Sequence, residues 1–496
     1  MSLEISTSLF LVALLLLPLL LLLIQNKPSR KDHPPSPFKL PIIGNLHQLG
    51  SLPHLSLLAL SKKHGPIMLL KLGGVQALVV SSADVAKEIM KAQDHIFSDR
   101  PSLIVPNKLL YGCKDVAFAR YGDYWRNVRK LSVLHLLSPT RIQSYRLVRE
   151  EEVAFMMDKI AKLSLLGPMN MSDILMSFAK DVISRVAFGK CSREEGWNEM
   201  IDVLIEESNE LLASFHLGDY VPWLAWVSRV TGLDARVNKT VSKLDEILEQ
   251  VIDRSRVDGR SRSGTFIDIL LSLQKDGNNC LDKDSIKALI EDMFGAGTDS
   301  TIIVLEWAMA ELIKNPEVMK KLQNEVRSKA KGTSKTILKQ DDLVEMNYLR
   351  AVIKEVMRLH PPGPLLIPRQ LTESTRIQGY KIPKQATVIV NAWAIGRDPK
   401  YWQNPAAFRP ERFLNSNVDF RGRDFQLIPF GFGRRICPGI QFAMSVIEIA
   451  LANLVCYFDW HVSDAAKTEV MCMQEAPGIT SRKKTRLHVV ATSYSF

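Results

Sequence analysis

The chain has 496 residues, a hydrophobic fraction of 46%, a charged fraction of 24% and a formal net charge of +11 at pH 7. This composition excludes a disordered or low-complexity scaffold. No zinc-finger spacing and no basic helix with interleaved aromatic residues predicts nucleic-acid binding. Six cysteines, none of them in a Cys-x-x-Cys pair, exclude a disulfide-rich secreted fold and favour a reducing compartment.

The amino-terminal segment is predicted to be a membrane anchor. Residues 5–24 carry no charge and are long enough for one membrane-spanning helix. A cleaved signal peptide is the alternative interpretation, but no small-x-small cleavage site follows the apolar run. Because Glu4 precedes this run and Lys27, Arg30 and Lys31 follow it, the positive-inside rule predicts that the rest of the chain is cytosolic.

The predicted domain organisation has three parts. We expect an N-terminal membrane anchor at residues 1–26, a Pro-rich hinge at residues 27–45 and one globular domain at residues 46–496. The run His33-Pro34-Pro35-Ser36-Pro37 favours a stiff extended linker, because proline fixes φ and lacks a backbone donor. No internal repeat divides the chain after residue 50.

The globular part is predicted to be mainly α-helical with small β-sheets. Alternating apolar stretches at residues 67–72 and 77–80 predict a sheet near the start. Helical periodicity then dominates residues 84–329. A second β-rich patch is expected at residues 375–390, and we expect the carboxy-terminal run 485–492 to pair with it.

Trp125 and Arg129 lie one helical turn apart and present an indole N–H and a guanidinium on the same side of a predicted helix. Such donors suit a carboxylate ligand, because a guanidinium can bind a carboxylate bidentately. The alternative, from these residues alone, is an ordinary surface arginine.

A long helix is predicted over residues 283–314, where Asn315-Pro316 ends it. Apart from Ala296, its segment 295–301 contains only middling or poor helix formers, and each glycine costs about 1 kcal/mol relative to alanine. Something must offset that cost. A close helix–helix crossing through small residues is one explanation.

Glu355 and Arg358 lie one turn apart in a stretch with helical spacing at residues 348–360, so they share a face and can form an ion pair. A solvated surface pair is the alternative. A buried carboxylate would need further donors, and Arg412 is the natural third member.

The segment 430–439 is the most informative part of the sequence. It reads Phe430-Gly431-Phe432-Gly433-Arg434-Arg435-Ile436-Cys437-Pro438-Gly439, which predicts a tight loop around one cysteine and a helix starting near Ile440. Backbone N–H groups of such a turn would stabilise a thiolate that ligates a metal. A buried structural cysteine is the alternative. A dinucleotide-binding loop is excluded, because Gly-x-Gly-x-x-Gly requires glycine where the chain has Ile436.

The spacing Phe430-x-x-Gly433-x-Arg435-x-Cys437-x-Gly439 resembles the haem-binding signature of the cytochrome P450 family. The resemblance extends from the Pro-rich hinge to the carboxy terminus and is greatest to plant A-type microsomal members. It implies the cytochrome P450 fold and haem b (iron protoporphyrin IX) as cofactor. Cys437 would be the axial ligand of the iron, in a cofactor loop that includes Phe430 and Gly431, and a thiolate ligand favours O–O cleavage.

The same resemblance implies roles for the other residues. The residues that would bind the haem propionates are Trp125, Arg129, Arg369 and Arg435. The residues that would form an architectural triad are Glu355, Arg358 and Arg412.

The resemblance also implies that small residues of the long helix open a groove for oxygen, while Asp299 and a hydroxyl relay protons. Where the family has a threonine after the aspartate, this chain has Ser300, with Thr301 next to it. Either hydroxyl can therefore act.

Positions that face substrate in the family are mostly apolar in this chain, which suits a small hydrophobic ligand. They correspond to residues 102–118, 205–217, 291–299, 365–367 and 477–479. The plant resemblance implies a terpenoid, alkaloid or phenolic of specialised metabolism.

The implied function is that of a haem-thiolate monooxygenase that uses O2 and electrons from NADPH. No flavin or nicotinamide domain fits between the motifs, so NADPH-cytochrome P450 reductase would donate the electrons, and Arg434 would suit an acidic reductase surface. The protein would be a single-pass protein of the endoplasmic reticulum membrane, in contact with lipid, with its catalytic domain facing the cytosol. A haem-thiolate isomerase or dehydratase and a non-catalytic haem-binding protein are the alternatives.

Overall fold

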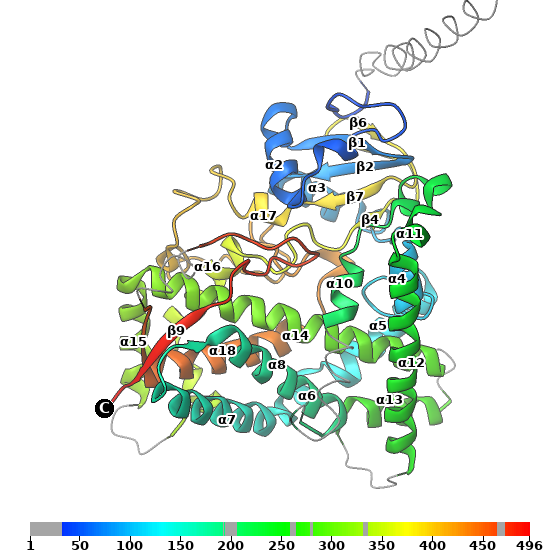
Figure 1. Ribbon diagram of the computed structural model, residues 1–496. Helices are drawn as coiled ribbons and strands as arrows, with labels where there is room; N and C mark the ends of the chain where they lie inside the picture. The colour runs from blue at the N-terminus through cyan, green and yellow to red at the C-terminus, as the bar shows by residue number, and fades with distance from the viewer. Residues whose placement is uncertain are drawn as a thin grey trace, which may run out of the picture.

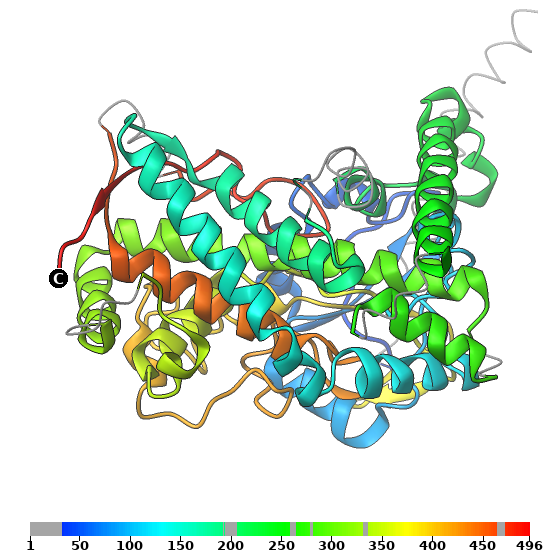
Figure 2. The same cartoon turned by 90° about the horizontal axis from the view of Figure 1, so that it is seen from below.

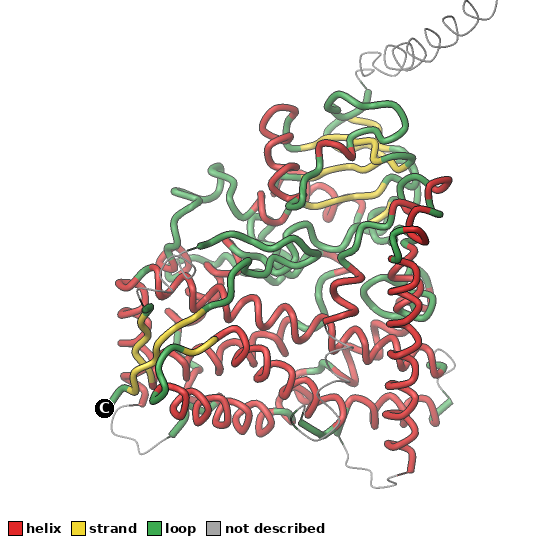
Figure 3. The backbone as a smooth tube through the Cα atoms, viewed as in Figure 1, coloured by secondary structure: helices red, strands yellow, loops and turns green. Residues whose placement is uncertain are grey.

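Helices pack around a long central helix, and a β-rich region lies at one end of the molecule (Figures 1 and 3). The computed structural model describes residues 32–191, 193, 206–257, 264–277, 281–330, 336–463 and 472–496. The predicted anchor and residues 27–31 of the hinge lie outside the described residues. From Asp32 onward the hinge lies against the β-rich region. The Lys381 N–H donates to the Asp32 carbonyl (2.6 Å), and the Leu69 N–H donates to the Pro35 carbonyl (3.0 Å).

The largest described sheet has the strand order β1-β2-β7-β4. β1 (Ile67–Leu72) and β2 (Val75–Val80) form the antiparallel hairpin that the sequence predicts, and β2 pairs in parallel with β7 (Thr387–Val390). β7 in turn pairs antiparallel with β4 (Arg369–Gln370). Gly73, with φ of 58°, makes the tight turn between β1 and β2 without the strain that a side chain would bring.

Two smaller sheets complete the β structure of the described residues. β5 (Thr375–Ile377) and β6 (Tyr380–Ile382) form a hairpin inside the predicted β-rich patch. The other sheet has the order β3-β9-β8, with the bounds Met169–Asn170, His488–Ser493 and Phe458–His461. The expectation that the carboxy-terminal run pairs with residues 375–390 is therefore wrong. β9 pairs with β8 because β8 directly follows the last long helix, which ends far from the β5–β6 hairpin (Figure 1).

The mainly helical architecture predicted from periodicity is confirmed. The helices are α2 (Pro53–His64), α3 (Ala83–Gln93), α4 (Ile104–Leu109), α5 (Asp123–Leu131), α6 (Pro139–Ser144), α7 (Arg146–Ser164), α8 (Met171–Phe188), α10 (Ser208–Leu212), α11 (Val227–Val230), α12 (Leu233–Val257), α13 (Phe266–Lys275), α14 (Lys283–Lys314), α15 (Pro316–Ala330), α16 (Asn347–Leu359), α17 (Ala392–Ile395) and α18 (Ile440–Tyr457). Short 3-10 turns occupy Leu46–Gln48, Leu217–Asp219, Pro222–Leu224, Gln340–Leu343, Pro410–Phe413 and Gly433–Arg435, and a π-helical turn occupies Ser132–Leu136.

The central helix α14 has the predicted bounds. The Asp282 side chain caps it by accepting a hydrogen bond from the Ser285 N–H (2.8 Å), and Asn315-Pro316 ends it. Most of its side chains are buried, as expected for a helix that other elements surround on several sides.

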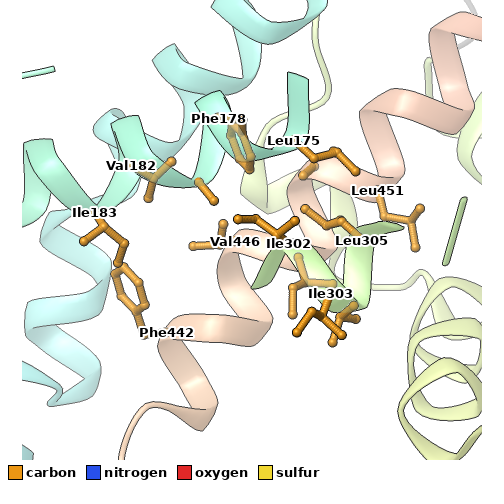
Figure 4. Packing of buried hydrophobic residues seen from close by; sticks show 14 of the residues in the cluster. Leu175, Phe178, Val182, Ile183, Ile302, Ile303, Leu305, Phe442, Val446 and Leu451 are labelled. Atoms are coloured by element: carbon orange, nitrogen blue, oxygen red, sulfur yellow. The ribbon is translucent and has the colours of Figure 1, made fainter. Parts of the chain in front are cut away.

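The core is built where α8, α14 and α18 meet (Figures 2 and 4). Buried apolar side chains of the three helices interdigitate there, including Val182, Ile302 and Val446. A Cβ atom on Gly297 would come within 2.8 Å of the Ile183 Cδ1 atom, so glycine lets the Ile183 side chain of α8 pack directly against the backbone of α14. The crossing explains part of the helix-weakening sequence of α14.

In the described part of the chain, α18 is the helix whose length and hydropathy would allow it to cross a membrane. Its side chains are largely buried against α14, α15 and α7, so we assign it to the protein core.

Candidate active site

Cys437 lies in a tight loop between the Gly433–Arg435 turn and the start of α18. The Cys437 N–H donates to the Phe430 carbonyl (3.0 Å), and the Gly439 N–H donates to the Cys437 Sγ atom (3.3 Å). Gly431 and Gly433 both have positive φ, which lets the loop close. A side chain on Gly433 would collide with the Asp94 carboxylate, so this glycine is also needed for close approach.

The surroundings of the Cys437 sulfur act on its ionisation in opposite directions. Burial raises the pKa of the Cys437 thiol, whereas the Gly439 N–H and the Arg129 guanidinium lower it. The protein alone therefore does not make a free thiolate. A cation at the sulfur would make the thiolate the stable form, which is the behaviour expected of a metal ligand.

Four arginines gather beside the cysteine loop. Arg100, Arg369 and Arg435 are at most 8% exposed, and Arg129 joins them at the rim. Most of their hydrogen bonds go to backbone carbonyls: Arg435 donates to Ser98 (2.8 Å) and Ala119 (2.6 Å), Arg369 to Phe432 (2.6 Å), Arg100 to Ala117 (2.8 Å) and Ile367 (2.6 Å), and Arg129 to Ile436.

The positive charge of this arginine cluster is poorly compensated. Asp94 is the one described carboxylate that forms an ion pair with any of the four, at 3.5 Å from Arg369, and the Arg369 Nη1 atom has no hydrogen-bond partner among the described residues. Burial lowers the pKa of Arg369 to about 10, and burial together with the Arg369 charge lowers the pKa of Arg435 to about 9. A dianionic group such as the two propionates of haem fits this cluster.

The Trp125 ring packs against two arginines of the cluster. It is buried, and its indole N–H donates to the Val116 carbonyl (3.0 Å). The guanidinium carbons of Arg435 and Arg129 lie 4.1 Å and 5.5 Å from the centre of its ring. The structure thus brings Trp125, Arg129, Arg369 and Arg435 together. The Trp125 N–H is already used in its hydrogen bond to the Val116 carbonyl. Direct donation from Trp125 to a propionate stays a prediction.

The Glu355 carboxylate forms the centre of a buried ion network. Arg358 donates two hydrogen bonds to it (2.7 and 2.8 Å), and Arg412 donates a third from Nε (3.1 Å). The backbone N–H of Arg409 donates a fourth (2.8 Å). Glu355 and Arg358 are at most 1% exposed. The pair is therefore not a solvated surface pair, and Arg412 occupies the position expected of a third member.

Asp299 is buried on α14 and pairs with a residue that the sequence analysis missed. Its Oδ1 atom accepts a hydrogen bond from the Arg482 Nε atom (2.6 Å), while its Oδ2 atom has no partner in the described structure. Arg482 lies in the hairpin-like segment 474–484, where the Ser481 carbonyl accepts a hydrogen bond from the Trp307 indole N–H (2.7 Å). Nothing local in the sequence distinguishes Arg482 from the lysines that follow it.

Ser300 and Thr301 differ in exposure although both hydroxyls bond to the backbone of α14. Ser300 donates to the Ala296 carbonyl (2.7 Å) and Thr301 donates to the Gly297 carbonyl (2.7 Å). Thr301 is 2% exposed, whereas Ser300 is half-buried on the same helix face as the exposed Ala296. Neither hydroxyl bonds to Asp299 directly.

Arg100 is the second residue that sequence analysis missed. The only local signal is Asp99-Arg100-Pro101, a charged pair between the apolar Phe97 and a proline. Its guanidinium donates hydrogen bonds to the carbonyls of residues 117, 367 and 368. These partners are distant in the sequence, so the role of Arg100 could be identified only from the tertiary structure.

Two of the stretches expected to face substrate contact α14. The Val116 N–H donates to Asp292 (2.6 Å), and Asn209 donates to the Gly295 carbonyl (3.5 Å). Residue 205, the first of the stretch 205–217, lies outside the described residues.

Comparison with known proteins agrees with this geometry. The cytochrome P450 family model matches residues 34–489. The chain is 50% identical to cytochrome P450 736A117 of Prunus mume over 94% of this chain and 92% of that protein. It is 47% identical to the norfluorocurarine oxidase of a Strychnos species (96% and 98%) and 46% identical to the (+)-menthofuran synthase of Mentha piperita (94% of each).

The fold is also similar to that of a zebrafish cytochrome P450 in a solved structure with abiraterone. The TM-score is 0.73 at 26% identity, and the match covers 89% of this chain and 100% of that chain. The cysteine loop, the uncompensated arginines and these extended matches lead to one assignment: the chain belongs to the cytochrome P450 family and is a plant cytochrome P450 monooxygenase.

Proposed function

We propose that this monooxygenase hydroxylates or otherwise oxidises a small hydrophobic metabolite of plant specialised metabolism, a terpenoid, an alkaloid or a phenolic. Two relatives support the alkaloid and terpenoid classes by name, the norfluorocurarine oxidase and the (+)-menthofuran synthase, and a strychnine-11-hydroxylase of Strychnos nux-vomica is 45% identical. The mostly apolar stretches around α14 support a hydrophobic ligand.

The cofactor of the proposed enzyme is haem b, which the family implies. Cys437 would be the axial ligand, with Phe430 and Gly431 shaping the loop around it. Arg129, Arg369 and Arg435 would bind the propionates, with Trp125 holding the guanidinium groups in place by stacking. Haem with a thiolate ligand, when bound, supplies the chemistry that activates molecular oxygen.

The observation that carries this proposal is the Cys437 sulfur, which accepts a hydrogen bond from the Gly439 N–H beside a cluster of buried arginines. A structural cysteine would need neither feature, because a buried thiol packs as a small apolar group. Cys456 is such a cysteine: it is fully buried on α18, and burial raises its pKa to about 12.

Proton delivery is proposed for Asp299 with Ser300 and Thr301. Asp299 forms an ion pair with Arg482, whose side chain is 36% exposed. The buried Asp299 carboxylate is therefore connected to solvent through a single side chain. Ser300 is on the accessible face of α14 and Thr301 is not, which favours the Ser300 hydroxyl. General acid–base delivery of this type needs a carboxylate and an alcohol within reach of solvent.

We propose residues 1–26 as a single-pass anchor in the endoplasmic reticulum membrane, residues 27–45 as the hinge and residues 46–496 as the catalytic domain on the cytosolic side. The exposed side chains of Phe215, Trp223 and Trp226 lie in the chain between α10 and α11. The ribbon shows α11 close to the β-rich end (Figure 1). The Gly74 N–H links the two regions by donating to the Tyr220 carbonyl (2.6 Å). Exposed aromatic side chains beside an anchor suit a membrane–water interface.

Electrons would come from NADPH-cytochrome P450 reductase, since the family implies a reductase partner. Arg434, half exposed next to the cysteine loop, would meet an acidic patch on that protein.

The absorption spectrum of the reduced, carbon monoxide-bound protein tests the proposal. A thiolate ligand red-shifts the Soret band, so we expect this band in the wild-type protein and in Cys456→Ala, and its loss in Cys437→Ala. A histidine-type band in the wild-type protein would contradict the assignment. Turnover of a terpenoid, alkaloid and phenolic library with NADPH and reductase then separates a monooxygenase from a haem-thiolate isomerase or dehydratase, which would act without reductase, and from a haem-binding protein without turnover.

A further inference from the structure

The segment 474–484 turns back on itself as a narrow hairpin without a helix or a regular strand. The Ala476 N–H donates to the Arg482 carbonyl (2.8 Å), and the Lys484 N–H donates to the Gln474 carbonyl (2.9 Å). The tip of the hairpin, residues 477–480, contains the stretch that is expected to face substrate. A hairpin this short buries little apolar surface of its own, so contacts with other elements must fix where the tip lies.

The arm that follows the tip is fixed to α14 and to the chain after α16. The Trp307 indole N–H donates to the Ser481 carbonyl (2.7 Å), and the Ser481 N–H donates to the Pro362 carbonyl (2.9 Å). The next residue, Arg482, pairs with Asp299 of α14. Because these contacts all come after the tip, the arm that precedes the tip needs contacts of its own.

Glu475 fixes the arm that precedes the tip. Its side chain is 8% exposed, and each of its two carboxyl oxygens meets a different residue. The Trp393 indole N–H of α17 donates to Oε1 (2.9 Å), and the His54 Nε2 atom of α2 lies 2.6 Å from Oε2. The centres of the His54 and Trp393 rings are 5.4 Å apart, so the two rings also contact each other. Glu475 thus joins the hairpin to two helices that lie next to the largest sheet (Figure 1).

The two helices that bind Glu475 are fixed to each other. Asn391, the residue that caps α17, directly follows β7, and its side chain donates to the His54 carbonyl of α2 (2.9 Å). The Arg397 guanidinium carbon lies 3.6 Å from the centre of the Trp393 ring. His54 and Trp393 therefore present their ring nitrogens to the hairpin at a fixed position.

Trp393 also connects two of the stretches that are expected to face substrate. Its backbone N–H donates to the Pro364 carbonyl (3.1 Å), next to the stretch 365–367. Its indole N–H binds Glu475, two residues before the stretch 477–479. The relative position of the two stretches thus depends on the contact between Glu475 and Trp393.

Glu475 is ionised at this buried position. Burial alone would raise the pKa of Glu475, but the contacts with His54 and Trp393 bring it below its ordinary value. Arg397 and His360 are the other basic residues that face Glu475, and neither forms an ion pair with it in the described structure. A carboxylate with a partner on each oxygen keeps one orientation, because rotation would break hydrogen bonds of a charged group.

We propose that Glu475 is a positioning residue for substrate selection. Through His54 and Trp393 it sets the position of the tip 477–480, and with it which ligands the enzyme accepts, without touching substrate or haem itself. This inference rests on the proposed function, in which residues 477–479 face the substrate. Loosening Glu475 therefore changes the affinity for ligands long enough to reach the tip and leaves the affinity for short ligands unchanged.

Amide hydrogen exchange of the haem-loaded full-length protein measures how firmly the hairpin is fixed, and it needs no ligand. The amides of Ala476, Ser481 and Lys484 donate to backbone carbonyls, so their exchange reports opening of the hairpin. In Glu475→Leu and His54→Leu these amides should exchange about tenfold to a hundredfold faster than in the wild-type protein, the effect of losing hydrogen bonds to a charged group. The double variant should exchange no faster than Glu475→Leu, because both changes remove the same contact.

Glu150→Gln is the matched control. The Glu150 side chain is also 8% exposed and pairs with Arg146 (2.7 Å), but it lies on α7, far from α2 and α17 (Figure 1). This variant should exchange the hairpin amides at the wild-type rate. Glu475→Gln keeps an acceptor for the Trp393 N–H and should exchange at a rate between those of the wild-type protein and Glu475→Leu. Together with Trp393→Phe, it repeats the test if Glu475→Leu does not fold.

Spectral titration with a series of N-alkylimidazoles, from methyl to dodecyl, measures ligand selection without turnover. Their ring nitrogen binds haem iron and shifts the Soret band, while the alkyl chain extends away from the iron. Glu475→Leu should bind N-methylimidazole as tightly as the wild-type protein does. For the longer chains the dissociation constants should change about fivefold, because a loose tip must be ordered when the chain reaches it. Glu150→Gln should keep the wild-type dependence on chain length.

Three results would overturn the inference. The first is wild-type exchange of the hairpin amides in Glu475→Leu. The second is faster exchange with an unchanged dependence on chain length, which would show that Glu475 fixes the hairpin without affecting selection. The third is an equal loss of affinity for short and long ligands, which would show that Glu475 supports the haem site as a whole. The carbon monoxide spectrum separates these results from failure of the proposed function, since without a thiolate band the monooxygenase proposal fails whatever the exchange rates are.

Discussion

Replacing Glu355 with glutamine should destabilise the protein by removing the centre of its buried ion network. The substitution keeps the size and shape of the side chain but removes the charge that neutralises Arg358, which is 1% exposed. Arg358 would retain only neutral acceptors, namely the glutamine amide oxygen and the carbonyl oxygens of Gly396, Pro405 and Ala407. Removing one partner of a buried pair costs about 3–5 kcal/mol, because the other charge stays buried without compensation.

This free energy translates into a small but measurable shift in melting temperature. Unfolding entropy is about 2.1 cal/mol/K per residue, so a chain of 496 residues has an unfolding entropy of about 1 kcal/mol/K. The Glu355→Gln variant should therefore melt about 3–5 °C below the wild-type protein. Circular dichroism at one fixed heating rate is the suitable measurement, since large proteins often unfold irreversibly.

A surface carboxylate provides the matched control. Glu345 pairs with Lys329 at 2.6 Å, but its side chain is 75% exposed, so Glu345→Gln should change the melting temperature little. If Glu355→Gln melts no lower than Glu345→Gln, burial of the ion network does not contribute as argued. The double variant Glu355→Met with Arg358→Met should recover part of the loss, because it removes both buried charges together.

The remaining predictions concern the reaction site. Ser300→Ala should lower the yield of product per NADPH consumed several-fold, with a smaller effect of Thr301→Ala, and equal coupling in both would contradict the assignment of the accessible hydroxyl. Arg369→Leu should lower the haem content of the purified protein, measured as Soret absorbance per protein, whereas Arg434→Gln should retain haem and lose reductase-supported rate at low ionic strength. The pKa of Glu291, a buried residue of α14, is about 8 in the folded protein and about 4.5 when the side chain is exposed. Between pH 4.5 and pH 8 the Glu291 carboxyl group is therefore protonated in the folded state and ionised in the unfolded state, so the free energy of unfolding should fall as the pH rises through this range. Glu291→Gln should lack this pH dependence, and melting temperatures that change with pH equally in the two proteins would refute the prediction.

Local features of the sequence were sufficient to predict the helices and the loop that carry the site residues. Asp282 and Asn315-Pro316 set the two ends of α14 because caps and proline act within one helical turn. The glycines of the cysteine loop and the start of α18 followed from the same kind of local rule. Glu355 and Arg358 were recognisable as a pair because they share one helix.

Contacts between distant segments were decided only by the tertiary structure. Arg482 meets Asp299, and Arg100 joins Arg369 and Arg435, across separations that no periodicity records. The strand β9 was expected beside residues 375–390 but pairs with β3 and β8, because the packing of α8 and α18 places those strands next to the carboxy terminus. Burial has the same origin: Glu291 looks like any acidic helix residue in the sequence, and only the surrounding elements remove it from water and raise its pKa.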